Sequence, residues 1–204
     1  MSVRAKIFIL YIAVGKSNIM SKYIYDNFNE DHEATIGCEF MAKNIEVNDR
    51  NVRIQIWDTA GAEAFRSITR SYYKNSTCAF LVYDITNIQS FSNITSWLED
   101  CRDMCSKDIL ICLVGNKIDL ENLRVVSKEE GEKYADDNGL LFFETSALDG
   151  TNIEKIFTQA TINIVNKIES GKIKTDMHSN GIKIKKFPNK DVEQVIEGNK
   201  KGCC

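Results

Sequence analysis

The chain has 204 residues, 43% of them hydrophobic, which is enough for one domain with a core and a tail. Its net charge of −3 is unevenly distributed, because residues 170–204 carry eight Lys and four Asp or Glu, which leaves this segment at +4 and the remainder at −7. An acidic body argues against a nucleic-acid-binding protein, and a basic tail suits either an anionic membrane surface or plain solvation.

Continuous apolar runs predict four buried strands, at residues 7–10, 80–83, 109–114 and 140–143. Strands that are apolar on both faces are typical of a parallel sheet covered by helices on each side. Val52, Ile54 and Ile56 instead alternate with polar residues, which predicts a strand with one wetter face. This strand is expected to pair antiparallel with residues 40–47 through a polar turn at residues 48–51.

Helical spacing of apolar residues appears in two segments between and after these strands. Strands that alternate with helices predict a doubly wound α/β domain, in which ligands bind beyond the carboxyl ends of the strands. After about Ser170 the periodicity fades, which predicts a flexible tail. The residues that carry the helical spacing are Phe91, Ile94, Leu98 and Cys101, and then Ile153, Ile156, Phe157, Ala160, Ile164 and Ile168.

A possible phosphate site is formed by Gly15, Lys16 and Ser17, which follow the first strand and open a helix. Backbone N–H groups at a helix N-terminus bind anions, Lys16 would reach the outer phosphates, and the Ser17 hydroxyl would bind Mg²⁺. The full motif has a glycine five residues before Gly15, where this chain has Leu10. On this segment alone, an ordinary strand-to-helix turn remains an equal alternative.

A guanine site is indicated by Asn116, Lys117 and Asp119, which end a buried strand. The Asp119 carboxylate can accept from N1–H and the 2-amino group of guanine, whereas adenine offers neither donor. Asn116 would tie neighbouring loops together, and the Lys117 stem would lie along the base. An isolated motif of this kind also fits a surface turn, but its order after residues 57–61 (WDTAG) and before residues 145–147 (TSA) favours a guanine-nucleotide site.

The chain resembles the Rab proteins, a membrane-traffic branch of the Ras-like small GTPases, from Lys6 to Asn166 and again at its last two residues. Residues 35–40 (TIGCEF) resemble the first Rab switch, and residues 53–57 (RIQIW), 65–69 (FRSIT), 72–74 (YYK) and 81–86 (LVYDIT) resemble Rab-specific blocks. Residues 65–73, 96–100 (SWLED) and 180–184 (NGIKI) are most similar to the Rab-two type of the early secretory pathway. The resemblance implies a P-loop small GTPase G domain at residues 1–169, with a mostly parallel six-stranded sheet, one antiparallel edge strand and helices on both faces.

The resemblance also implies roles for individual residues. Thr35 would bind Mg²⁺ and the γ-phosphate, Asp58 would hold Mg²⁺ through water, and the Gly61 N–H would touch the γ-phosphate. Phe28 would pack against the guanine edge, although a loop anchor in the core is an alternative role. The full set for GTP or GDP is Ala13, Val14, Gly15, Lys16, Ser17, Asn18, Phe28, Thr35, Asp58, Gly61, Asn116, Lys117, Asp119, Ser146, Ala147 and Leu148, with Ser17, Thr35 and Asp58 at Mg²⁺, and Lys16, Gly61 and position 62 in catalysis.

Partners and location follow from the same resemblance. Phe40, Trp57 and Tyr72 match the aromatic triad that Rab effectors contact, and an exchange factor, a GTPase-activating protein, a GDP-dissociation inhibitor and the prenylation machinery would be further partners. Cys203 and Cys204 match the double-cysteine prenylation site, and residues 170–204 would be a hypervariable tail. The expected location is the cytoplasmic face of early secretory or Golgi membranes, in exchange with the cytosol.

The cysteine pattern and the lack of a signal peptide or membrane span predict a cytosolic protein that would need a lipid anchor to bind membranes. The seven cysteines include no CxxC pair and have no nearby His, which favours reduced thiols over a zinc site. The N-terminus lacks a signal-peptide pattern, and no run approaches the ~20 apolar residues of a membrane span.

Three positions depart from the family pattern. Residues 10–12 (LYI) replace a glycine and a small polar pair, and Leu148 replaces a common lysine, as it does in some Rab relatives. Ala62 replaces the glutamine that orients the attacking water in hydrolysing relatives such as Ras. The sequence therefore predicts a nucleotide switch with impaired intrinsic hydrolysis; the alternative is a non-hydrolysing or nucleotide-free module that scaffolds effectors.

Overall fold

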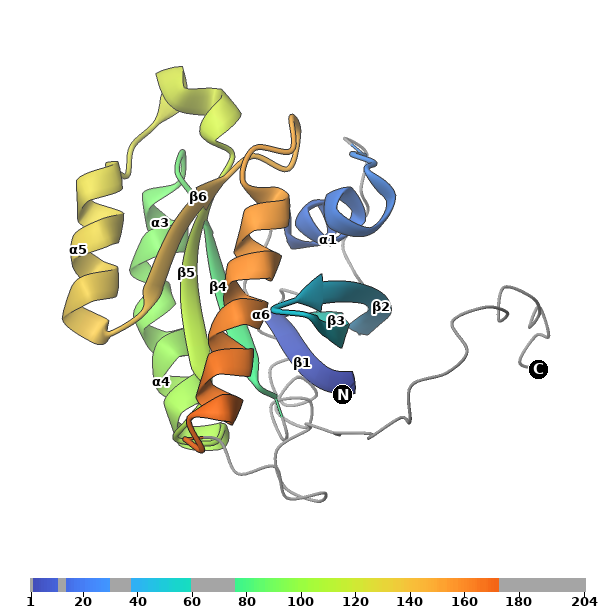
Figure 1. Cartoon of the computed structure of the whole chain (residues 1–204). Coiled ribbons are helices and arrows are strands. Elements are labelled where there is room, and N and C mark those ends of the chain that lie inside the picture. The colour runs from blue at the N-terminus through green and yellow to red at the C-terminus, as the bar shows by residue number, and fades with distance from the viewer. Residues whose placement is uncertain (1, 11–13, 30–37, 60–75, 173–204) are drawn as a thin grey trace, which may run out of the picture.

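A six-stranded sheet runs through the part of the chain that the computed structural model describes, which is residues 2–10, 14–29, 38–59 and 76–172 (Figure 1). Its order is β2-β3-β1-β4-β5-β6, and every neighbouring pair is parallel except β2 with β3. The predicted parallel sheet with an antiparallel pair at its edge is confirmed. The strands are β1 (Ser2–Leu10), β2 (Cys38–Val47), β3 (Arg50–Thr59), β4 (Cys78–Asp84), β5 (Leu110–Asn116) and β6 (Leu141–Thr145).

Helices cover both faces of this sheet (Figure 1). Helices α1 and α6 lie on one face, while α3, α4 and α5 lie on the other. None of the helices in the described ranges is long and apolar enough to cross a membrane. Their bounds are α1 (Lys16–Tyr25), α3 (Ile88–Ser92), α4 (Ile94–Met104), the 3-10 helix η2 (Ile118–Leu123), α5 (Lys128–Asn138) and α6 (Ile153–Glu169).

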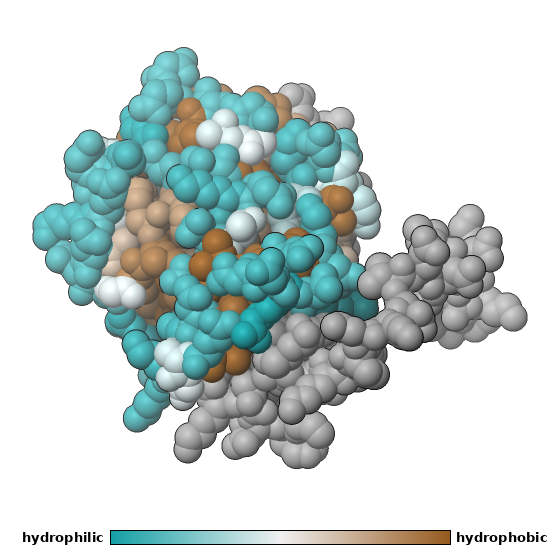
Figure 2. Space-filling view, in the orientation of Figure 1, coloured by the Kyte–Doolittle hydropathy of each residue, from teal (hydrophilic) through white to brown (hydrophobic). Residues whose placement is uncertain are grey.

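Burial follows the apolar patterns in the central strands but not at the far edge. Every residue of β4 and β5 is buried, as their continuous apolar runs predict. In β6, however, Leu141, Phe142 and Phe143 are only partly buried, because this strand has a neighbour on one side alone. Figure 2 shows hydrophobic surface between α5 and α6, over the position of β6. The expectation that this strand is covered on both faces is therefore wrong in part.

The β2–β3 hairpin turns more tightly than the sequence predicts. Val47 pairs directly with Arg50, so only Asn48 and Asp49 form the turn instead of the four residues 48–51. Both turn residues have positive φ, 50° and 56°, which is the left-handed pair that a type I′ hairpin requires and that Asn and Asp tolerate. Val52, Ile54 and Ile56 are fully buried, while Arg53 is exposed, so the predicted wetter face of this strand is confirmed.

The segment after β5 contains a helix that apolar periodicity does not reveal. Helix α5 is strongly polar, and its start is fixed by a capping box in which Ser127 and Glu130 each bind the other's backbone N–H. Its end is fixed by Gly139 in a left-handed conformation. End signals alone therefore define this helix.

Gly131 gives α5 its close approach to the sheet. A Cβ atom at this position would lie 2.6 Å from the Tyr83 hydroxyl oxygen and 2.7 Å from Cε2 of Phe142. The Tyr83 hydroxyl is itself buried and has no hydrogen-bond partner among the described residues. The absent side chain at position 131 thus leaves room for two rings from β4 and β6.

We expect Gly131→Ala to destabilise the protein. Overpacking of a tight core costs about 1–3 kcal/mol, which exceeds the gain of about 1 kcal/mol that alanine brings to an open helix. Chemical denaturation measures the free energy of unfolding. The same substitution in a Tyr83→Phe background is the control, since it deletes the nearest clashing atom and should reduce the loss. A stabilising Gly131→Ala would contradict this packing.

Candidate functional site

Three neighbouring strands end in polar residues that lie in one row. Asp84 of β4 is in register with Asn116 of β5, and Asn116 is in register with Thr145 of β6. All three are nearly or fully buried. The row lies at the carboxyl edge of the sheet, where ligands bind in doubly wound folds. The described parts of the predicted motifs meet at this edge.

Asn116 joins three separate segments of this edge. Its Nδ2 donates to the backbone carbonyl of Val14 over 2.8 Å, and its Oδ1 accepts from the Thr145 hydroxyl over 3.1 Å. Asn116 is only 1% exposed, so the loss of either bond would leave a buried polar group without a hydrogen-bond partner. The amide therefore holds the segment before α1 against the ends of β5 and β6.

Gly15 lets the chain pass close to this amide and enter α1. It caps the helix with φ 84°, a conformation that glycine adopts without strain. A Cβ atom here would lie 2.9 Å from Nδ2 of Asn116. The first N–H groups of α1 have no intrahelical acceptor, and together with the helix dipole they suit an anion.

Lys16 is the first residue of α1 and is 6% exposed. Burial lowers the pKa of its ammonium from the ordinary value of 10.5, and the nearby carboxylate of Asp58 opposes this shift. A phosphate bound at the helix N-terminus would supply a second negative charge and would favour the charged form in the same way. This environment fits a lysine that binds an anion.

Ser17 and Asp58 supply oxygen atoms next to Lys16. The Ser17 hydroxyl donates to Oδ2 of Asp58, which is fully buried near the end of β3. A hydroxyl and a carboxylate are hard oxygen ligands of the kind that Mg²⁺ takes together with water and phosphate oxygens. The donor chemistry therefore fits the predicted magnesium ion, and Thr35, its third predicted ligand, lies outside the described residues.

Asp119 and Ser146 meet on the predicted base-binding side. The Ser146 hydroxyl donates to Oδ1 of Asp119 over 2.6 Å, which fixes the carboxylate. A carboxylate has about four acceptor sites, so one such bond leaves capacity for the two donors of a guanine edge. Ala147 is 2% exposed, whereas Leu148 is 45% exposed.

The loop after Ser146 is held by its own hydrogen bonds. Asp149 accepts from the Thr151 N–H over 2.7 Å, and the bonds from Thr151 hold the pKa of this carboxyl below its usual value. The Asp149 N–H donates to the Ser146 hydroxyl, and the Gly150 N–H donates to the Ser146 carbonyl. These bonds order the backbone around Ala147.

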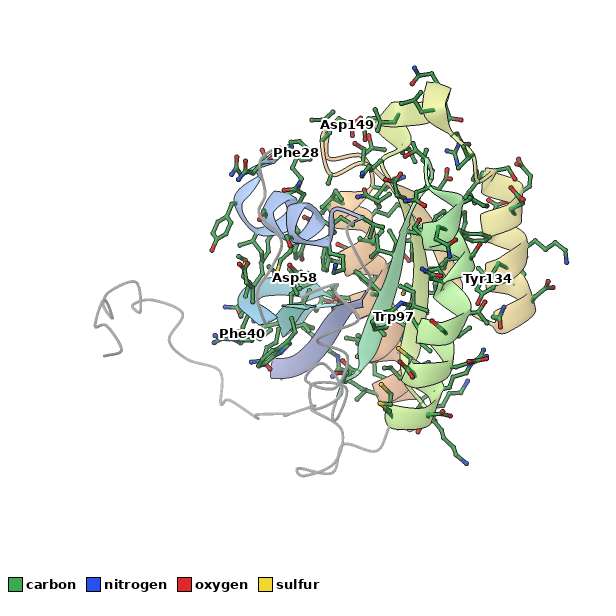
Figure 3. All side chains as sticks on the ribbon, turned by 180° about the vertical axis from the view of Figure 1, so that it is seen from behind. Phe28, Phe40, Asp58, Trp97, Tyr134 and Asp149 are labelled. Carbon is green, nitrogen blue, oxygen red and sulfur yellow. The ribbon has the colours of Figure 1, made fainter. Side chains whose placement is uncertain are left out.

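Phe28 is held near the same end of the molecule, where Figure 3 also shows Asp149. The Asn18 side chain bonds both backbone groups of Asn29, at 3.0 and 3.4 Å, and so ties the Phe28 segment to α1. Phe28 is partly buried against the core. A ring in this position is compatible with a base contact and with a core anchor.

Two of the three predicted effector aromatics are neighbours. Phe40 of β2 and Trp57 of β3 are paired across the antiparallel ladder, with ring centroids 4.9 Å apart and an interplanar angle of 54°. Phe40 is 46% exposed, so part of this aromatic pair faces solvent. An exposed aromatic pair of this kind suits a partner surface.

Seven predicted site residues lie outside the described residues, and one neighbour of the site was not predicted. The seven are Ala13, Thr35, Gly61, Ala62, Tyr72, Cys203 and Cys204. The unpredicted neighbour is Asp84, whose Oδ2 lies 2.7 Å from Nζ of Lys117. Its signal in the sequence is an acidic residue at the end of a fully apolar strand.

Comparison with known proteins identifies relatives across most of the chain. Residues 6–166 match the model of the Ras family. The Ras-related protein Rab-2B of Dictyostelium discoideum is 48% identical over 158 residues, which cover 78% of this chain and 78% of that protein.

We expect Gly15→Ala to destabilise the protein more than Gly139→Ala does. Both glycines have positive φ, and an alanine in that conformation costs about 1–2 kcal/mol. A Cβ atom at Gly139 meets nothing within 4 Å, whereas one at Gly15 displaces the Asn116 amide and should cost about 1 kcal/mol more. Chemical denaturation of both variants gives the difference, and equal losses would mean that Asn116 moves aside without cost.

Proposed function

The chain belongs to the Ras family of small GTPases, and we propose that it works as a Rab-like guanine-nucleotide switch in vesicle traffic with impaired GTP hydrolysis. The observation that carries this proposal is the Asn116 amide, which links the segment before Lys16 to the strands that bring Asp119 and Ser146 together. This link joins a phosphate-binding element to a base-binding element within one site. A nucleotide is the ligand that has both parts.

The described residues divide the work of binding in this proposal. The N–H groups at the start of α1 and the Lys16 ammonium bind the phosphates, while Ser17 and Asp58 hold Mg²⁺. The ion would neutralise phosphate charge and orient the outer phosphates. Asp119 accepts hydrogen bonds from the guanine edge, the Lys117 stem lies along the base, and the Ala147 N–H donates to guanine O6. Phe28, in the segment after α1, packs against the base.

Nucleotide content tests the proposal directly. The purified protein should release GDP or GTP on denaturation, identified by chromatography of the extract. The second candidate function, a nucleotide-free module that keeps the Rab surface, is favoured by residues 10–12 (LYI), which are bulky where the family has small residues. Protein that contains no nucleotide and takes none up would support this second function and contradict the first.

We expect Asp119→Asn to reduce the preference for guanine. The substitution replaces one acceptor by a donor, which leaves a guanine N–H group without a partner and costs about 1–3 kcal/mol, or more because the lost acceptor is charged. Competition between GTP and xanthosine triphosphate measures the preference in both proteins. Asp137→Asn, the same carboxylate-to-amide change on an exposed face of α5, is the control. A mutant that prefers GTP as strongly as the wild type contradicts the role of Asp119.

We propose that Ala62 slows intrinsic GTP hydrolysis. Alanine cannot orient water, and the loss of one well-placed polar group in a catalytic site costs about 10²–10³ in rate. Ile12, if it lies near the γ-phosphate as its place in the motif implies, would add crowding. A GTPase-activating partner that brings its own arginine and glutamine would restore turnover.

We expect Ala62→Gln to accelerate hydrolysis in an Ile12→Gly background. Single-turnover assays on preloaded GTP compare the wild type, both single variants and the double variant. The double variant should be fastest, since it has both the side chain that orients water and the room to place it. A wild-type rate like that of an ordinary Rab, or no gain from Ala62→Gln, contradicts the impaired switch.

We propose that residues 1–169 form the switch and residues 170–204 a tail that attaches it to early secretory or Golgi membranes. One prenyl chain binds a membrane only marginally, so two at Cys203 and Cys204 would anchor it, and the tail's lysines would favour an anionic surface. Effectors would contact Phe40, Trp57 and Tyr72. An exchange factor, a GTPase-activating protein, a GDP-dissociation inhibitor and the prenylation machinery would complete the cycle.

We expect Cys203→Ser and Cys204→Ser together to release the protein into the cytosol, whereas either alone should leave partial attachment. Fractionation of cells into membrane and soluble protein measures this. Cys105→Ser, in the folded domain, is the control. A double variant that still pellets with membranes would place the anchor elsewhere.

A further inference from the structure

Lys117 is ordered in the structure by a carboxylate on the neighbouring strand. Its Nζ lies 2.7 Å from Oδ2 of Asp84, and the side chains of Lys117 and Asp84 are 36% and 8% exposed. Asp84 is in register with Asn116, so the ion pair forms where two strands of the predicted site end. The aliphatic part of the Lys117 side chain therefore lies between its own backbone and the Asp84 carboxylate.

Asp84 is itself fixed from several directions. Its Oδ1 accepts from the Thr86 N–H over 2.8 Å and from the Thr86 hydroxyl over 2.7 Å. The Ser90 hydroxyl accepts from the Asp84 N–H over 3.0 Å. A buried carboxylate is stable only when charge and hydrogen bonds compensate it, and here Thr86 and Lys117 do so.

Both ends of the Lys117 side chain are therefore defined. The backbone is in the left-handed conformation, with φ 71°, and the ammonium is held by Asp84. A free lysine side chain has many conformations, and it loses this conformational entropy when a ligand orders it. Asp84 orders the stem before the nucleotide arrives, so binding does not carry that cost.

We propose that Asp84 is a positioning residue for the nucleotide, acting through Lys117, whose stem it holds in place as a preformed wall for the base. This inference rests on the proposed function. It assigns a binding role to a side chain that sequence motifs leave unassigned. It also predicts that the effect of Asp84 on nucleotide affinity disappears when Lys117 is absent.

A double-mutant cycle on the release of fluorescent GDP in Mg²⁺ tests this coupling. We expect Asp84→Asn to release GDP about tenfold faster, the scale of one lost hydrogen bond to a charged group. Lys117→Met should have an effect at least as large, and the double variant should be no faster than Lys117→Met. Thr86→Val, which removes one hydrogen bond to Asp84, should have a smaller effect in the same direction and covers the case in which Asp84→Asn does not fold.

Asp137→Asn is the matched control, since Asp137 pairs with Lys133 on exposed faces of α5 and should not change release. If Asp84→Asn releases GDP at the wild-type rate, or if the two single effects multiply in the double variant, Asp84 does not act through Lys117 and the inference fails. In both cases a wild type that binds guanine nucleotide leaves the proposed function standing. A wild type that binds no guanine nucleotide overturns both.

Discussion

The buried amide of Asn116 is the interaction on which the geometry of the site depends. It donates to the Val14 carbonyl and accepts from the Thr145 hydroxyl, and these partners belong to segments far apart in the chain. A parallel sheet aligns the ends of β1, β4, β5 and β6 but does not place the loops that follow them. One amide with a donor and an acceptor places two of these segments at once, which a smaller or apolar side chain could not do.

The position of this amide requires a glycine immediately before α1. Gly15 must pass within contact distance of Asn116 and must also turn the chain with positive φ into the helix. Either demand alone disfavours a side chain, and the two together exclude one without strain. The start of α1 is therefore held close to Asn116, and Lys16 and Ser17 lie near Asp58.

The sequence predicts the framework better than its edges. Continuous apolar runs identify β4 and β5 correctly because both strands are covered on both faces. The same pattern overstates the burial of β6, since a sequence does not reveal which strand lies at the edge. The turn at Asn48 and Asp49 is tighter than predicted, because positive φ at two non-glycine residues depends on the twist of the paired strands.

The sequence predicts those residues of the candidate site that belong to recognisable motifs, and it does not predict the others. Asp119 and Ser146 lie far apart in the sequence, and their motifs place them in one site because both motifs end neighbouring strands. Asp84 belongs to no motif with an assigned role, so its contact with Lys117 emerges only from the register of β4 and β5. Contacts between side chains of different strands join residues far apart in the sequence, and local sequence patterns do not predict them.

The β2–β3 hairpin is joined to the domain by the parallel pairing of β3 with β1, by ion pairs and by buried side chains. Lys43 of β2 pairs with Glu154 at 3.6 Å and Arg50 of β3 pairs with Glu169 at 2.6 Å, so ion pairs tie the hairpin to both ends of α6. The acidic partners Glu154 and Glu169 are 67% and 42% exposed, and solvent-exposed pairs contribute only about 0–1 kcal/mol each.

Three buried side chains contribute more to this attachment than the two ion pairs. Val52, Ile54 and Ile56 are fully buried, and each such side chain stabilises the fold by about 1.5–3 kcal/mol. Trp57 therefore lies on a strand that is firmly packed against the core. Phe40 lies on the edge strand β2, and its ring contact with Trp57 joins this exposed side chain to a strand that the core holds in place.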